Sequence, residues 1–351
     1  MTAHLHTRPA PETLIRRLLA RLPVIAAACC LSFQAAAATP AAATPARQPA
    51  AQAVHTTTTA KRAPVRKSKS RKAISRSKAR SQQGPVESDL VLKSNAALVV
   101  DLDTGEALAL KNADEVLPIA SLTKLMTGLV VLDAKLPMDE VLEISKEDVD
   151  TERNTHSRLT VGTRLTRDEM LLLALMSSEN RAALALSRNF PGGRAAFITR
   201  MNLKAQALGM VKTHFGDPAG LSNLSVSTAR DLHHLVSAAY AQPLMRRYTT
   251  MPESTVQVGH RTLNFINSNR LVRSSGDWNI ELQKTGFTNE AGRCLVMHVT
   301  VMRRRLAMIF LDSDGTMTRY ADAARVRRRV EQEAKFGKPK ADLASAAASS
   351  S

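Results

Sequence analysis

Three short motifs follow one another along the chain and together carry the groups needed to break an amide bond. Residues 121–124 read Ser-Leu-Thr-Lys, residues 178–180 read Ser-Glu-Asn, and residues 284–286 read Lys-Thr-Gly. Amide cleavage by a serine requires removal of the hydroxyl proton, stabilisation of the oxyanion and protonation of the leaving amine. The motifs supply hydroxyls, amines and an amide for these tasks, so they indicate acyl transfer through a covalent serine intermediate.

The first motif offers a nucleophile and a base. Ser121 opens an apolar run with helical spacing, and residues three apart share one face of a helix, so Lys124 should project beside it. Burial on an apolar helix lowers the pKa of an amine, and a neutral Lys124 can then take the hydroxyl proton. Alone, Ser121 would suit an ordinary helix N-cap, and 75–78 also read Ser-x-x-Lys within a basic tract. The order of all three motifs favours the catalytic interpretation.

The second motif lies between two predicted helices, so Ser178 and Asn180 are expected on a connecting loop. Ser178 can relay a proton to the leaving nitrogen. Asn180 can hold a substrate amide through a donor and an acceptor together. In isolation, a loop serine and a helix N-cap would explain these two residues equally well.

The third motif follows a predicted strand at 280–284, which Lys284 closes. Lys284 and the Thr285 hydroxyl suit a substrate carboxylate, whereas a lone Lys284 would simply be an exposed lysine at a strand end. Gly286 allows close approach of backbone because it has no side chain.

Hydrophobic periodicity and turn residues predict the elements around these motifs. Strands lie at both ends of the folded region with helices between them, which indicates one antiparallel sheet assembled from both ends. Thr166 and Glu169 form a capping box that starts a helix. The expected strands are 96–101, 106–111, 140–145, 280–284, 293–302 and 305–311, and the expected helices begin at 121 and 166 and span 181–188, 193–208, 228–240 and 320–333.

Composition divides the 351 residues into four segments. Residues 1–38 combine arginines, a short apolar stretch and a run of alanines, which is typical of a cleaved export signal and predicts a periplasmic protein. Residues 39–88 are rich in Ala and Pro and then in Lys and Arg, which predicts a disordered linker. Residues 89–335 form the expected catalytic domain, and 336–351 a disordered tail.

The cysteines indicate neither an anchor nor a disulfide. No Leu-rich lipobox precedes Cys29 and Cys30, which disfavours lipoprotein anchoring. Cleavage of the signal would leave Cys294 alone, and its apolar strand-like surroundings predict a buried structural thiol.

The net formal charge of +18 is concentrated in one tract, because residues 61–80 hold ten Lys or Arg and no Asp or Glu. One hypothesis is that this tract weakly binds anionic wall or membrane surfaces, and the alternative is a solvated linker. The low aromatic content argues against nucleic-acid binding, which usually stacks bases on aromatic rings. The histidines form no metal-binding pattern, so neither a metal nor a cofactor is expected.

The chain resembles the low-molecular-mass penicillin-binding proteins, which are serine D-alanyl-D-alanine peptidases of the D-alanyl-D-alanine carboxypeptidase family. Within them it is most similar to the endopeptidases of the penicillin-binding protein 7 type. The resemblance spans roughly residues 92–334 and is carried by 118–127, 176–183 and 278–289, with further similarity at 217–222 and 227–232.

This resemblance implies an enzyme that acts on peptidoglycan stem peptides, takes part in cell wall remodelling and is inhibited covalently by β-lactams. It implies an α/β (α+β) fold of the β-lactamase and penicillin-binding-protein transpeptidase type, with an antiparallel five-stranded sheet flanked by helices. The implied roles are acylated nucleophile for Ser121, base for Lys124, relay and positioning groups for Ser178 and Asn180, carboxylate binding for Lys284 with Thr285 and Gly286, and an oxyanion hole from the backbone N–H groups of Ser121 and Phe287.

Three functions compete at this point. The favoured one is a D,D-peptidase that cleaves D-alanyl cross-bridges, with terminal D-alanine as a further substrate. A serine β-lactamase on the same fold would need a group to activate the deacylating water, and no convincing E-x-x-x-N constellation lies between Ser178 and Lys284. A non-catalytic wall-binding protein would rely on the basic tract. The sequence leaves endopeptidase and carboxypeptidase preference open.

Overall fold

The computed structural model describes residues 90–274 and 278–337. The predicted export signal at 1–38 and linker at 39–88 lie outside the described residues, as does nearly all of the predicted tail at 336–351. None of the helices within the described ranges is long and apolar enough to cross a bilayer.

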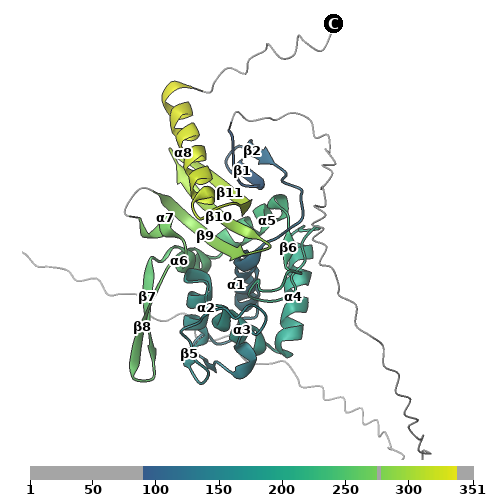
Figure 1. Ribbon diagram of the computed structural model, residues 1–351, viewed down its shortest axis with the longest axis vertical. Helices are drawn as coiled ribbons and strands as arrows, with labels where there is room; N and C mark the ends of the chain where they lie inside the picture. The colour runs from purple at the N-terminus through teal and green to yellow at the C-terminus, as the bar shows by residue number, and fades with distance from the viewer. Residues whose placement is uncertain (1–89, 275–277, 338–351) are drawn as a thin grey trace, which may run out of the picture. The chain divides into compact units, whose positions relative to one another are not determined.

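A five-stranded sheet forms the centre of the described part (Figure 1), in the order β2-β1-β11-β10-β9. All its neighbouring strands run antiparallel, so the strands from the two ends of the folded region meet at the β1–β11 pair, as the sequence predicted. Its strands are β1 (Ala96–Asp101), β2 (Ala107–Lys111), β9 (Asn279–Thr288), β10 (Gly292–Val301) and β11 (Arg304–Ser313).

Both faces of this sheet are buried. The register aligns Val99, Met308 and Met297 in one row across the strands, and these side chains pack with helix α8 (Thr318–Phe336), which lies along β10 and β11 (Figure 1). The adjacent row faces the other helices and ends at Lys284, which pairs with Val296. The register therefore places Lys284 on the face that packs against the helical region.

Helix α1 (Thr123–Asp133) lies inside the helical region and is buried on all sides, because nine consecutive residues from Thr123 to Val131 are buried. A helix that is apolar all round belongs in a core, and here α2, α3, α4 and α5 pack around it. The remaining helices are α2 (Arg167–Met176), α3 (Asn180–Arg188), α4 (Gly193–Ala207), α5 (Ala229–Tyr240), α6 (Pro243–Thr250) and α7 (Arg270–Arg273).

Several local predictions are confirmed. The capping box at Thr166 and Glu169 starts α2, and Cys294 is a fully buried thiol on β10 whose pKa burial raises to about 11. The predicted end of a strand at Lys284 is wrong, since β9 continues to Thr288 against β10.

Sequence periodicity missed α6, α7 and most of the short strand pairs, in which only the β4 segment was expected. The pairs are β3 (Leu117–Pro118) with β6 (Val226–Ser227), β4 (Val141–Glu143) with β5 (Arg164–Thr166), and β7 (Glu253–Val258) with β8 (Arg261–Ile266).

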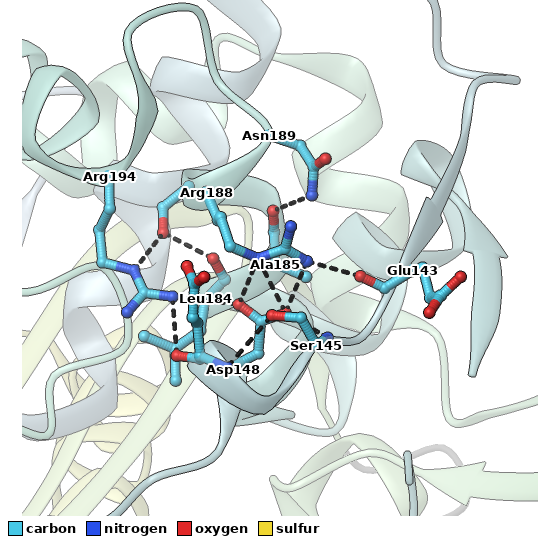
Figure 2. Close-up of polar contacts among 10 residues, drawn as sticks. Glu143, Ser145, Asp148, Leu184, Ala185, Arg188, Asn189 and Arg194 are labelled. Atoms are coloured by element: carbon cyan, nitrogen blue, oxygen red, sulfur yellow. Dashed lines mark hydrogen bonds and ion pairs between the residues drawn. The ribbon is translucent and has the colours of Figure 1, made fainter. Parts of the chain in front are cut away.

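A buried carboxylate fastens the end of α3 to its surroundings (Figure 2). The side chain of Asp148 is fully buried and accepts hydrogen bonds from the guanidinium groups of Arg188 and Arg194, at 2.8 Å and 3.0 Å. It also accepts a hydrogen bond from the backbone N–H of Ser145. Paired in this way, the charge holds the α3 end against the turn η2 (Lys146–Asp148).

Candidate active site

Ser121 lies in the single turn η1 (Ala120–Leu122), which leads directly into α1. Ala120, the residue before Ser121, has a φ of +46°, which is uncommon for a residue with a β-carbon. Ala120 and the preceding Ile119 are both buried. Lys124 follows in the first turn of α1, and its Nζ donates a hydrogen bond to Ser121 Oγ at 2.9 Å. The predicted proximity of serine and lysine is therefore present.

Lys124 is fully buried, and this burial lowers the pKa of its amine to about 8, whereas Asp217 and Glu179 act to raise it. Its Nζ also donates to Asn180 Oδ1 and to the Ala219 carbonyl, both at 2.7 Å. Three acceptors fix the protonated amine in place, and the neutral form, which has only two N–H groups, has a lone pair that can accept the hydrogen of the Ser121 hydroxyl. An amine with this pKa is substantially neutral near pH 8, so it can act as a base.

The Ala219 carbonyl is fixed by a tight turn that Asp217 organises. The Asp217 carboxylate accepts hydrogen bonds from the backbone N–H groups of Ala219, Gly220 and Leu221 at 2.7, 2.6 and 3.1 Å. The sequence of 217–221 predicts only a local turn. The structure shows that this turn presents one of the three acceptors of the Lys124 amine.

The second motif lies at the junction of α2 and α3. Ser178 has a φ of +64° in the connection, but Asn180 is the first residue of α3, so the expectation of a loop holds only for Ser178. Asn180 Nδ2 donates to Thr155 Oγ1 at 2.9 Å, and Thr155 Oγ1 in turn donates to Asp150 at 2.8 Å. This chain of bonds orients the Asn180 amide with its oxygen toward Lys124. No motif in the sequence points to Thr155 or Asp150.

Glu179 lies between Ser178 and Asn180 in the second motif and is mostly buried. Burial raises the pKa of its carboxyl group, while a hydrogen bond from Ser157 and the charge of Lys124 oppose that effect. Oε1 of Glu179 has no hydrogen-bond partner among the described residues.

Strand β9 brings the third motif against the nucleophile. A β-carbon built on Gly286 would lie 3.0 Å from the Ile119 carbonyl oxygen and 3.2 Å from the Ser121 nitrogen, so only glycine allows this approach without displacement. Phe287, the next residue, has a side chain that is 51% exposed and stacks with Arg293, whose Cζ lies 4.3 Å from the ring centroid.

Lys284 is fully buried, and burial followed by the charges of Lys124 and Arg319 holds the pKa of its amine well below the usual value. Its Nζ donates to the Thr285 carbonyl at 3.0 Å. The Thr285 side chain leaves the opposite face of β9 and shares a hydrogen bond of 2.8 Å with Ser268 Oγ. The two polar groups thus flank the strand on its two sides.

Arg319, in the first turn of α8, was missed by sequence reasoning because it is one of several arginines in that helix. It is only 6% exposed, and Nη1 donates to the Gly286 carbonyl at 2.8 Å and to the Cys294 carbonyl at 3.0 Å. A third basic side chain therefore lies beside β9 together with Lys284 and Lys124.

The structure thus brings four of the eight predicted residues into direct contact, whereas within the described ranges Ser178 forms no side-chain hydrogen bond with them. Ser121, Lys124 and Asn180 are joined by hydrogen bonds, and Gly286 contacts the turn that carries Ser121.

Comparison with known proteins identifies the family of the chain. The family model of the D-alanyl-D-alanine carboxypeptidases matches residues 81–315. The chain is 52% identical over 242 residues to the D-alanyl-D-alanine endopeptidase of Pseudomonas aeruginosa, and 45% identical over 242 residues to that of Escherichia coli. Both matches cover 68% of this chain and 78% of the relative.

Solved structures show the same fold. The DD-transpeptidase of Streptomyces K15 has a TM-score of 0.63 at 29% identity and covers 68% of this chain and 97% of its own. Penicillin-binding protein D2 of Listeria monocytogenes in its ampicillin-bound form has a TM-score of 0.59 at 33% identity, and the match covers 68% of this chain and 98% of that protein. The expected transpeptidase-type fold is confirmed, and the chain belongs to the D-alanyl-D-alanine carboxypeptidase family of serine peptidases.

Proposed function

We propose that this enzyme is a periplasmic D,D-peptidase that hydrolyses D-alanyl cross-bridges of peptidoglycan, with terminal D-alanine as a second substrate, and so remodels the cell wall. The observation that carries the proposal is the buried Lys124 amine, 2.9 Å from Ser121 Oγ, in a chain of this family. The names of the two relatives with the highest identities quoted above favour cross-bridges, since both are endopeptidases.

In the first step, neutral Lys124 takes the proton of Ser121 as Oγ attacks the carbonyl carbon of the D-alanine at the scissile bond. The N–H groups of Ser121 and Phe287 would hold the resulting oxyanion, which the close approach of β9 to the Ser121 nitrogen supports. Ser178 passes the proton to the leaving nitrogen, which departs as a free amine. Asn180, fixed by Thr155, positions the substrate amide.

Thr285 and Arg319 would hold the carboxylate of the leaving group, and the fully buried Lys284, on the other side of β9, would act on it only electrostatically. The buried guanidinium of Arg319 makes this edge of β9 electropositive, and a bound carboxylate would act to raise the depressed pKa of the Lys284 amine. Water then attacks the acyl-enzyme, with Lys124 again removing a proton, and Ser121 is regenerated. A β-lactam would follow the first step and remain as a stable acyl group.

The test uses the purified full-length chain with fluorescent penicillin and with cross-linked and uncross-linked muropeptides. Wild type should gain one adduct by intact mass, and Ser121→Ala should gain none. Ser75→Ala is the matched control, because Ser75 opens the second Ser-x-x-Lys match, and it should be labelled like wild type. Labelling of Ser121→Ala would refute the assignment, and rapid turnover of a chromogenic cephalosporin would indicate a β-lactamase instead.

We also propose that the basic tract at 61–80, outside the described residues, weakly holds anionic wall or membrane surfaces. Deleting the tract should reduce sedimentation with sacculi or anionic vesicles at low salt, because exposed charges attract one another most strongly when they are least screened. Penicillin acylation should not change. Equal sedimentation of the two forms would show that the tract is a simple linker.

A further inference from the structure

A pocket of about 460 Å³ lies beside the third motif. Two of its lining arginines, Arg270 and Arg273, come from the short helix α7, and the third is Arg319 of α8. Ser268 also lines it. Among the described residues, no Asp or Glu takes part in the lining.

This pocket is joined to the proposed carboxylate site by direct contacts. Ser268 Oγ lies 2.8 Å from Thr285 Oγ1, and Arg319 donates to the Gly286 carbonyl at 2.8 Å. Both contacts are made to residues of the Lys-Thr-Gly motif. A molecule whose carboxylate is held at Thr285 therefore has the pocket as its immediate continuation.

The positive charge of the pocket is not neutralised by described residues. Arg319 donates to two backbone carbonyls and to the Tyr320 hydroxyl, which are neutral acceptors. Arg270 contacts Met317 Sδ at 2.9 Å, and neither Arg270 nor Arg273 forms an ion pair with a described acidic side chain. Guanidinium groups in this arrangement favour carboxylates, which they can bind in a bidentate manner.

The two substrate types of the proposed function differ in the group that leaves through this side. Terminal D-alanine leaves as one small amino acid with a single carboxylate, which Thr285 and Arg319 would already hold. A cross-bridge leaves as a second stem peptide, whose acidic residues and terminal D-alanine carry further carboxylates. Only the second leaving group is long enough and anionic enough to engage the arginine pocket.

We propose that Arg270 and Arg273 bind carboxylates of the leaving stem peptide and thereby make the enzyme prefer cross-linked over terminal D-alanyl substrates. This inference rests on the proposed D,D-peptidase function. Arg270 and Arg273 act on specificity alone, since neither reaches the Ser121 hydroxyl through any contact in the described structure.

The test compares kcat/KM for a cross-linked muropeptide dimer and for an uncross-linked pentapeptide. In the double variant Arg270→Ala/Arg273→Ala, cleavage of the dimer should fall roughly tenfold, while cleavage of the pentapeptide and penicillin acylation should stay within about twofold of wild type. Arg200→Ala, which removes an exposed arginine from α4, is the matched control and should leave both substrates unchanged.

A chemical counterpart uses a dimer whose leaving stem has its carboxylates amidated. Wild type should lose roughly the same tenfold factor on this dimer, and the double variant should lose no more. A double variant that keeps the wild-type preference, or a wild type indifferent to amidation, would overturn this inference and leave the proposed function intact. A wild type that reacts with penicillin but cleaves neither peptide would overturn the proposed function and this inference with it.

Discussion

Gly220 packs directly against Ala120, the residue that precedes the nucleophile. A β-carbon built on Gly220 would lie 1.9 Å from the Ala120 carbonyl oxygen and 2.9 Å from the Ser121 nitrogen. Gly220 also has a φ of +76°, which favours glycine. The turn that Asp217 organises thus has two contacts with the active site. Gly220 packs against the backbone before Ser121, and the Ala219 carbonyl accepts a hydrogen bond from Lys124.

Replacing Gly220 by alanine should displace the nucleophile. We expect Gly220→Ala to lower the free energy of unfolding by about 3 kcal/mol or more and to reduce penicillin acylation by at least about a hundredfold. Urea denaturation and stopped-flow acylation would measure the two effects.

The control is Gly209→Ala, because Gly209 has a nearly equal φ of +75° but no atom within 4 Å of the position that a β-carbon would take. This variant carries the backbone strain alone and should cost about 1 kcal/mol with unchanged acylation. Equal effects of the two substitutions would show that the contact with Ala120 does not matter.

Thr155 should act as a positioning residue for Asn180. In Thr155→Val, the Asn180 amide loses the acceptor of its Nδ2 and is held only through its Oδ1, so acylation should fall roughly fivefold to tenfold with little change in stability. Thr155→Ser keeps the hydroxyl and should restore the rate. A valine variant that is as fast as wild type, or a serine variant that stays as slow as the valine one, would contradict this role.

Much of the fold could be predicted because its signals are local. The capping box that starts α2 involves Thr166 and Glu169, three residues apart, and the strands of the sheet show continuous apolar runs. The end of β9 was misplaced because Thr285 and Gly286 weaken the strand signal, whereas pairing with β10 extends the strand to Thr288.

In the active site, too, local contacts could be predicted from the sequence and long-range contacts could not. The Ser121–Lys124 contact follows from helical spacing, so the sequence reveals it. The other acceptors of the Lys124 amine come from Asn180, 56 residues away, and Ala219, 95 residues away. Arg319 reaches β9 only through the packing of α8 on the sheet. Contacts of this kind depend on tertiary structure and produce no periodic pattern in the sequence.

The base role of Lys124 predicts a pH dependence for acylation. Because the neutral amine is the active form, the second-order rate constant for penicillin should rise with pH and reach half its maximum near the Lys124 pKa of about 8. Lys124→Met should lose roughly a thousandfold in rate and the pH step with it. Rate profiles measured from about pH 5 to about pH 10 would define the step.

Glu179 allows this titration to be assigned to Lys124. The charge of Glu179 helps to raise the pKa of Lys124, whereas the pKa of Lys284 is set by burial and by the charges of Lys124 and Arg319. In Glu179→Gln the profile should therefore move to lower pH. An unchanged midpoint, or a move to higher pH, would mean that a group other than Lys124 controls the rate.

The buried carboxylate of Asp148 should stabilise the fold without taking part in catalysis. Asp148→Asn leaves Arg188 and Arg194 without their shared counter-charge, so the free energy of unfolding should fall by about 2–4 kcal/mol. Asp133→Asn is the control, because Asp133 pairs with Lys204 in an ion pair with side chains 28% and 23% exposed, and its loss should cost at most about 1 kcal/mol. Acylation by the folded protein should match wild type in both variants, since Asp148 contacts the far end of α3 from Asn180. Equal stability of the two variants would show that burial does not strengthen the Asp148 pairs.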